Sequence, residues 1–146
     1  MPGQKGRVIH CYRCIYTWRV RRPENPAVCP RCKSKLYEVP RIRPVSLGTG
    51  HGIPEIVTPH RQEILRLAQQ YGVRRIWVFG SVRRREATSR SDVDLLLEWR
   101  RPASLLDVAG LRIDLRRTLG RNVDLVNRHG LHWALEPQVE AEKVPL

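Results

Sequence analysis

The spacing of the four cysteines constrains the fold of this chain more than any other feature. They form two Cys-x2-Cys pairs, CYRC and CPRC, separated by fourteen residues: Cys11, Cys14, Cys29 and Cys32. Two such turns can place four thiolates around one Zn²⁺ ion in the tetrahedral arrangement of closed structural sites. A redox-active dithiol is the alternative, but the symmetry of two pairs favours a metal. The sequence therefore predicts a structural zinc site near the N-terminal end.

The residues around the cysteines have the pattern of a small metal-stabilised module. Between the pairs, IYTWRV alternates as a strand does, and ENPAVCP supplies a turn. We expect His10, next to Cys11, to be a bystander, because four thiolates complete the metal site. Residues 11–41 resemble the short zinc ribbons that prokaryotes append to small regulatory or nucleic-acid-binding proteins. One departure is Ile15, where such ribbons often carry glycine.

The next segment, IRPVSLGTGHGIPEIV, reads as a linker because it combines three glycines and two prolines with little periodicity. Its GTGHG superficially resembles a phosphate-binding loop. It follows no convincing strand, however, and Pro54 comes too soon for a helix to begin there. We therefore predict a zinc ribbon over residues 1–41, a linker over 42–57 and a globular domain over 58–146.

Regular apolar patterns begin at Thr58 and continue to the end of the chain. They predict a helix from Thr58 to about Gly72 and a second helix that starts at Ser104 and ends at Gly120. Strands are predicted at RIWVF, DVDLLLEW and NVDLV, and a short helix over 134–143. The order of these elements predicts a small α/β domain whose helices pack on a mixed three- to four-stranded sheet.

Two carboxylates at the start of one predicted strand form the core of a candidate site. Asp92 and Asp94 are two residues apart, so their side chains project from the same face of the strand. Both can converge on Mg²⁺, which proteins hold through one or two carboxylates plus substrate phosphates. Gly80 and Ser81 end the preceding strand. If a helix begins there, backbone N–H groups and the Ser81 hydroxyl can cradle an anion, and Gly80 lets a phosphate approach the main chain.

A third carboxylate is available at Asp124 in NVDLV. An aspartate between Val123 and Leu125 is costly in a buried strand without a partner, and a shared metal would offset that cost. The alternative is an aspartate that faces water. Three carboxylates suit a pair of Mg²⁺ ions, one to lower the pKa of an attacking hydroxyl and one to hold a triphosphate.

Residues 58–146 resemble the minimal nucleotidyltransferase domain of the DNA polymerase β superfamily. The shared pattern is Gly-Ser, ten residues and Asp-x-Asp, here Gly80-Ser81 followed by Asp92-Val93-Asp94. The resemblance implies a polymerase-β-like fold that transfers a nucleoside monophosphate to a hydroxyl, with ATP as the expected substrate. It also implies an antitoxin that adenylylates a tyrosine on a helical HEPN ribonuclease toxin.

The resemblance assigns roles to individual residues. Gly80 and Ser81 would bind the triphosphate, and Arg84 matches a common arginine that could contact phosphate. Asp92 and Asp94 would bind both metals, with Asp124 as the third ligand and base. Arg85 stands where the family usually has glycine.

The net charge of +13 leaves a second function open. Residues 1–52 hold 11 Lys and Arg against 2 Asp and Glu, so the basic excess is concentrated near the cysteines. Such a segment can bind nucleic acid through phosphates, which would make the protein a non-catalytic antitoxin or regulator. No apolar run approaches the roughly 18–20 residues needed to cross a bilayer, so we expect a cytoplasmic protein without membrane contact.

Overall fold

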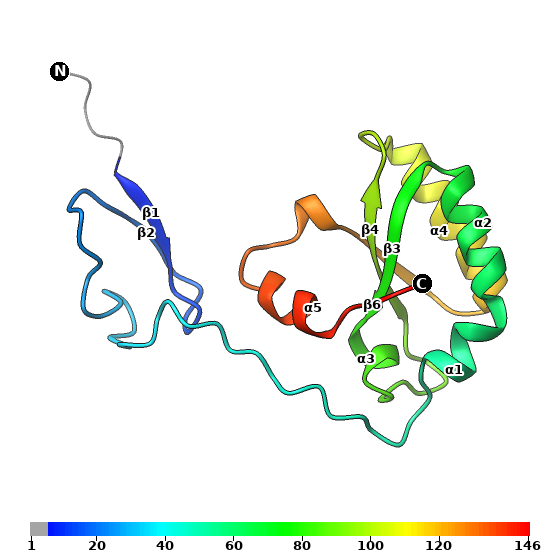
Figure 1. Ribbon diagram of the computed structural model, residues 1–146, viewed down its shortest axis with the longest axis horizontal. Coiled ribbons are helices and arrows are strands. Elements are labelled where there is room, and N and C mark those ends of the chain that lie inside the picture. Colours follow the sequence, from blue (N-terminus) through cyan, green and yellow to red (C-terminus); the bar gives the residue numbers. More distant parts are fainter. Residues whose placement is uncertain (1–5) are drawn as a thin grey trace.

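A four-stranded mixed sheet in the order β5-β4-β3-β6 forms the centre of the protein (Figure 1). The computed structural model describes residues 6–146. The strands are β3 (Val73–Phe79), β4 (Val93–Trp99), β5 (Val123–Asn127) and β6 (Val144–Pro145). β3 pairs antiparallel with β4 and β6, whereas β4 and β5 are parallel. The mixed sheet agrees with the prediction, and β6 is an edge strand too short to be recognised in the sequence.

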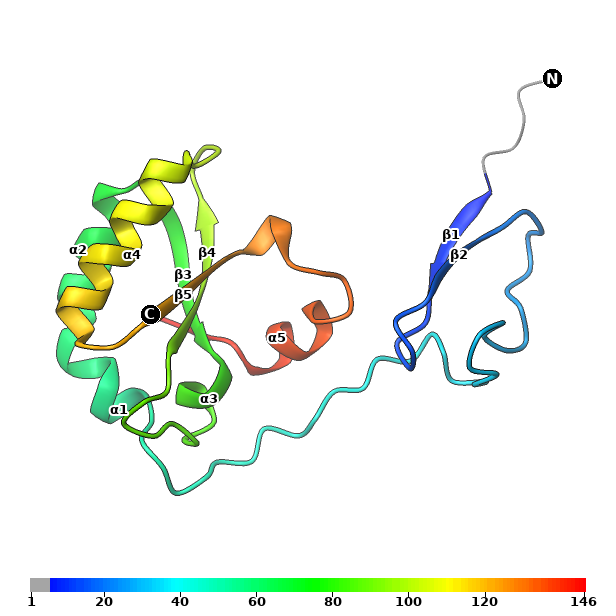
Figure 2. The same ribbon diagram turned by 180° about the vertical axis from the view of Figure 1, so that it is seen from behind.

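Helices cover both faces of this sheet (Figures 1 and 2). α2 (Arg61–Gln70) and α4 (Leu105–Leu119) lie side by side on one face, and α5 (Glu136–Glu142) lies on the other. The remaining helical segments are short: α1 (Ile53–Ile56), η1 (Thr58–His60), α3 (Gly80–Arg83) and η2 (Arg128–Gly130). The first turn of the predicted Thr58 helix is thus η1, and the regular helix begins at Arg61.

The alternation of side chains along β4 decides on which face the site lies. Val93, Leu95 and Leu97 are buried in the main core beneath α2 and α4. Leu96 packs instead with Trp77 and Val139 of α5. Because successive side chains of a strand point to opposite faces, Asp94 shares the α5 face with Leu96. The polar site therefore lies on the side of the sheet that α5 covers.

The caps of α4 confirm the helix predicted from Ser104 to Gly120. Ser104 Oγ accepts the N–H of Asp107, and Asp107 Oδ2 accepts the N–H of Ser104, which makes a capping box. Gly120 ends the helix with a φ of 63°, in the left-handed region where glycine avoids the Cβ clash. These caps fix where the chain turns back toward β5 and Asp124.

The structure differs from the predicted linker in its second half. α1 forms within residues 42–57, and Ile56 and Val57 are buried in the main core. His51 forms a β-bridge with Ala87, and Gly48 N–H donates to Arg84 O. These contacts join segments that are far apart in the sequence, so the local pattern of glycine and proline could not predict them.

The cysteine-rich segment forms a separate hairpin, β1 (Arg7–His10) paired antiparallel with β2 (Thr17–Val20). The small core of this segment contains Ile9, Tyr37, Cys11 and Cys29. The hairpin contacts the segment before α5, because the ring of Trp133 stacks on His10 at 4.3 Å and meets Tyr12 edge-on at 5.2 Å. Across residues 6–146, none of the helices has the length and apolar character of a membrane span.

Candidate functional site

Strand register brings the predicted carboxylates together at one end of the sheet. Asp94 of β4 is the direct neighbour of Asp124 of β5, and Asp92 immediately precedes β4. The charges of Asp124 and Asp92 both raise the pKa of Asp94, after the larger effect of its burial. Asp124 is exposed rather than buried, because β5 is an edge strand. The burial argument for Asp124 was therefore wrong, although the pairing of β4 and β5 places Asp124 directly beside Asp94.

Gly80 fits against Asp94 so closely that no other residue has room there. A Cβ on Gly80 would lie 2.2 Å from Asp94 Oδ2, far inside van der Waals contact. Gly80 also has a φ of 73°, which side-chain-bearing residues rarely adopt. Gly80 begins the single-turn helix α3, which the sequence left as a condition, and Ser81 follows in its first turn.

Asp94 is the carboxylate with the most perturbed acidity. Its burial, followed by the charges of Asp124 and Asp92, raises its pKa to about 6, while Arg84 acts in the opposite direction. Three like charges without a counter-ion disfavour ionisation of the innermost one, and a divalent cation would reverse this effect. Hard oxygen donors of this kind fit Mg²⁺.

Arg84 is held by protein carboxylates on two sides. Its Nε donates to Glu86 Oε2 at 2.9 Å, and its Nη1 donates to Glu142 Oε2 at 3.1 Å. The ion pair with Glu86 and then Glu142 raises its pKa further above the ordinary value. Arg84 also lines the cavity beside Asp94. The hydrogen bonds to the two carboxylates use Nε and Nη1, so Nη2 can contact a phosphate in this cavity.

Arg85 occupies the position at which related domains usually have glycine, and its backbone shows why. Its φ is 55°, in the left-handed region. Its guanidinium pairs with Glu55 at 2.8 Å, its Cγ packs over Gly52, and its Nε is buried without a hydrogen-bond partner among the described residues. Arg85 therefore anchors α1 and does not enter the carboxylate site.

Two cavities flank the carboxylates. One of about 410 Å³ lies between β4 and α5, and Gly80, Arg84 and Asp94 form part of its wall. The other, of about 260 Å³, is bordered by Asp92 and Asp124 together with Arg112 and Arg116 of α4. The carboxylates thus have a largely apolar cavity on one side and a basic one on the other.

Sequence reasoning missed Glu142, which is buried at the centre of this site. Its Oε1 accepts the backbone N–H of Gly80 at 3.0 Å and also contacts Arg84. A signal was present, because Glu142 lies three residues after the buried Val139 of α5. An acidic residue on the apolar face of a short helix indicates a specific partner.

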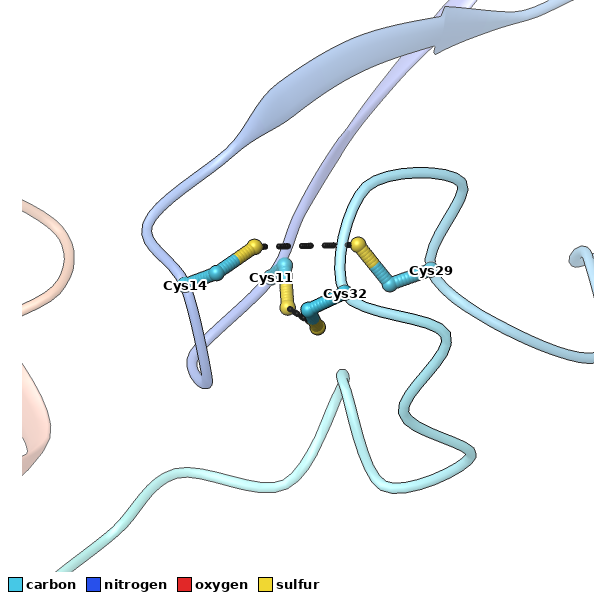
Figure 3. Close-up of side chains that lie close together, drawn as sticks. All are labelled: Cys11, Cys14, Cys29 and Cys32. Atoms are coloured by element: carbon cyan, nitrogen blue, oxygen red, sulfur yellow. Dashed lines mark hydrogen bonds between the residues drawn. The ribbon is translucent and has the colours of Figure 1, made fainter.

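The four cysteines converge on a single point (Figure 3). Cys11 and Cys32 have their Sγ atoms 3.7 Å apart, and those of Cys14 and Cys29 are 3.8 Å apart. Zn–S bonds of about 2.3 Å in a tetrahedron require S···S separations of about 3.8 Å. The cluster therefore fits a Zn²⁺ ion, whereas His10 bonds Thr17 and lies outside the cluster. Among residues 6–146, the cysteines form the one group of three or more possible ligands whose atoms all lie within 4.8 Å of one another, and the three aspartates are not drawn together this closely.

Each Cys-x2-Cys turn is followed by a residue in the left-handed region. Ile15 and Lys33 both have a φ of 60°, and their N–H groups donate to Cys11 O and Cys29 O. Desolvation raises the pKa of Cys14 to about 12, whereas backbone N–H groups of Cys32 and Arg31 overcome desolvation and lower that of Cys29 to about 7. Metal binding has to displace the remaining thiol protons.

Known proteins resemble the part of the chain that carries the carboxylates. A family model described as a nucleotidyltransferase domain matches residues 60–146. Protein adenylyltransferase MntA of Thermococcus cleftensis is 40% identical over 92 residues, which are 63% of this chain and 90% of that protein. A protein of Methanocaldococcus jannaschii named "putative protein adenylyltransferase" is 33% identical over 84 residues, covering 58% of this chain and 90% of its own.

Solved structures show the same fold. One, described as a "putative minimal nucleotidyltransferase", has a TM-score of 0.59 and 39% identity, and the match covers 68% of this chain and all of that one. A toxin–antitoxin complex with AMP-PNP has a TM-score of 0.52 and 22% identity, covering 57% of this chain and 69% of its own, a likeness of fold. Since the family model spans the sheet, the Gly-Ser turn and all three aspartates, the protein belongs to the nucleotidyltransferase domain family and is a nucleotidyltransferase.

Proposed function

We propose that the protein transfers AMP from ATP to a tyrosine hydroxyl of a cognate HEPN-type toxin in the cytosol, and so acts as an antitoxin. The observation that carries this proposal is the side-by-side placement of Asp94 and Asp124, with Asp92 next to them and the Gly-Ser turn against Asp94. Such a site combines ligands for cations with hydrogen-bond donors for phosphates. Transfer from a nucleoside triphosphate requires both.

The residues divide the chemistry between them. Ser81, which follows the buried Gly80, and Arg84 Nη2 hold the triphosphate, and Asp92, Asp94 and Asp124 would hold two Mg²⁺ ions. Bound Mg²⁺ would offset the charge of the phosphates and lower the pKa of the acceptor hydroxyl. Asp124, the exposed carboxylate, accepts the proton of that hydroxyl. The hydroxyl oxygen then bonds the α-phosphorus, the bond from the α-phosphorus to the bridging oxygen breaks, and pyrophosphate leaves.

The choice of nucleotide and acceptor rests on different support. Adenylyl transfer to protein is supported by the names of the relatives, of which this chain covers 90%. A protein acceptor is also supported by size, because a domain of about 90 residues offers little surface to hold a polynucleotide. The tyrosine and the HEPN toxin rest on the family resemblance.

Mass spectrometry of the partner tests this proposal. We would co-express the chain with the product of the adjacent gene and measure the intact mass of that product. The expected result is an added AMP on a tyrosine, lost when both Asp92→Asn and Asp94→Asn are introduced and kept in the surface control Glu136→Gln. An unmodified partner in the presence of active wild-type protein would exclude the toxin as acceptor.

A second candidate function is nucleic-acid binding by the zinc ribbon. It is favoured by the exposed ring of Tyr16, which stacks on Trp18 at 5.9 Å and lies beneath the guanidinium of Arg31 at 5.8 Å. Stacked aromatic rings next to cations suit single-stranded bases and phosphates. Salt-sensitive binding of RNA or DNA that persists in Asp92→Asn/Asp94→Asn and is lost in Tyr16→Ala would support this function.

A further inference from the structure

The carboxylate of Glu142 is an unusual feature of the α5 face because it is charged and buried. Only 3% of the residue is exposed, and no other charged residue among 6–146 is buried to this degree. Removing a carboxylate from water is costly unless hydrogen bonds and an opposite charge compensate it. A carboxylate retained in such a place therefore points to a specific task.

Glu142 has three partners that together compensate its charge. Oε1 accepts the Gly80 N–H at 3.0 Å, both oxygens face Arg84 Nη1 at 3.1 and 3.2 Å, and Oε2 accepts from Gln138 Nε2 at 3.2 Å. Its backbone carbonyl also accepts from Arg83 Nε at 2.9 Å. The end of α5 is therefore fastened to α3 through both the side chain and the main chain of one residue.

These contacts hold Gly80 at a second point besides Asp94. The Glu142 carboxylate accepts the Gly80 N–H, and Asp94 Oδ2 fills the space where a side chain would be. The Gly80 N–H is consequently engaged within the protein. No protein group bonds the Ser81 hydroxyl among the described residues, so Ser81 is available to a phosphate.

The same carboxylate sets the shape of the cavity beside the catalytic aspartates. Glu142 and Val139 of α5 line the 410 Å³ cavity together with Gly80, Arg84 and Asp94. Since Glu142 joins α5 to the Gly-Ser turn, a change in its contacts alters the distance between these two elements.

We infer that Glu142 is a positioning residue of the nucleotidyltransferase site. Its carboxylate holds the Gly80 amide and Arg84 in place, so that Ser81 and the free edge of Arg84 face the triphosphate while Gly80 stays against Asp94. Glu142 itself contacts no phosphate. This inference rests on the proposed binding of triphosphate at the Gly-Ser turn and assigns a role to a residue outside it.

Substitution of Glu142 in the full-length protein tests the inference. Glu142→Gln keeps the size of the side chain and removes the charge opposite Arg84. The matched control is Glu140→Gln on the same helix, which removes ion pairs to Arg128 and Lys143 outside the cavity. The measurements are the Kd for Mg-ATP by calorimetry and, with the unmodified partner protein as acceptor, KM and kcat per folded molecule.

We expect Glu142→Gln to weaken Mg-ATP binding by about tenfold or more, as for a lost hydrogen bond to a charged group. The KM for ATP rises with it, whereas Glu140→Gln leaves both unchanged. In the double variant Arg84→Gln/Glu142→Gln the two effects are less than additive, because both act through one contact. A purely structural role would lower the folded fraction without changing Kd or KM. Unchanged Kd and KM in folded Glu142→Gln would overturn the inference.

Amide measurements on the wild type keep the inference testable if the variant does not fold. We expect the Gly80 amide to be protected from hydrogen exchange without nucleotide and to stay protected with Mg-ATP, while the Ser81 resonance shifts. An unprotected Gly80 amide would contradict the role of Glu142 even if nucleotide binds. A protected Gly80 amide in a protein that binds no nucleoside triphosphate would instead contradict the proposed function.

Discussion

Asp94 of β4 and Asp124 of β5 lie directly opposite each other in the parallel pairing of the two strands. They are thirty positions apart in the sequence, and α4 with its two caps supplies the connection that brings them together. The burial of Asp94, followed by the charges of Asp124 and Asp92, raises the pKa of Asp94. The site is thus built at a cost in stability that a bound cation removes.

The acidity of Asp94 predicts a pH-dependent effect of Asp94→Asn on stability. The pKa of about 6 in the folded protein exceeds the ordinary value of 3.8, so the folded state binds the proton more tightly than the unfolded state. Without metal, the contribution of Asp94 is therefore favourable below about pH 4 and is lost as the pH rises through 6. We expect the melting temperature of Asp94→Asn to exceed that of the wild type by a few degrees at pH 7 and by less at pH 4.5.

Calorimetric melting in a chelating buffer measures this difference. Addition of Mg²⁺ at pH 7 should raise the melting temperature of the wild type, should act more weakly at pH 5, and should act least on Asp94→Asn. A melting difference that does not change between pH 4.5 and 7 would show that Asp94 ionises normally.

Gly72 and Gly80 flank β3 and both have a positive φ, but substitution by alanine should affect activity at only one of them. Gly72→Ala and Gly80→Ala both force a side chain into the left-handed region, which costs roughly 1–2 kcal/mol. A Cβ at Gly72 meets nothing within 4 Å, whereas at Gly80 it meets Asp94 Oδ2. We expect Gly72→Ala to lose stability and keep its activity per folded molecule. Gly80→Ala should lose activity by more than about 100-fold because Asp94 is displaced; equal activities would contradict this geometry.

The features of this protein that can be predicted from its sequence are those that depend on residues close together in the chain. Short-range spacing predicts the two cysteine pairs, the capped helix α4, three of the four strands of the sheet, and the pattern of Gly80, Asp92 and Asp94. Strands β1 and β6 and the packing of α1 depend on pairing between distant segments. Glu142 is 62 residues from Gly80, so no local pattern predicts their hydrogen bond. For the same reason the sequence assigned Arg84 a phosphate contact alone and did not predict its ion pair with Glu142.

Strain at the zinc turns predicts a stabilising substitution. Ile15 is 60% exposed and has a φ of 60°, so its β-branched side chain gains little from packing while the backbone is strained. Ile15→Gly should stabilise the zinc-bound ribbon by about 1 kcal/mol. Lys33→Gly is the matched control at the same φ without β-branching, and its gain should be smaller. Competition with a zinc indicator measures the affinity, and weaker zinc binding by Ile15→Gly would contradict the strain.

Removal of zinc should unfold the ribbon without unfolding the sheet domain. The ribbon core consists of few apolar residues around the cysteines, whereas the main core lies beneath α2 and α4. We expect a chelator of high zinc affinity to abolish the β1–β2 hairpin, seen by Trp18 fluorescence, while Mg-ATP binding persists. Loss of thiol protons makes the zinc affinity rise with pH between about 5 and 8. Cooperative unfolding of both parts on chelation would contradict two independent units.

The most direct measurement of the central claim is label transfer from the two ends of ATP. The purified protein and the product of the adjacent gene are incubated with Mg²⁺ and either α-³²P-ATP or γ-³²P-ATP. The account predicts that the partner is labelled by the α-phosphate alone, that pyrophosphate appears in equal amount, and that Asp94→Asn abolishes both. Label from the γ-phosphate, or label from the α-phosphate that persists in Asp94→Asn, would contradict adenylyl transfer at the carboxylate site.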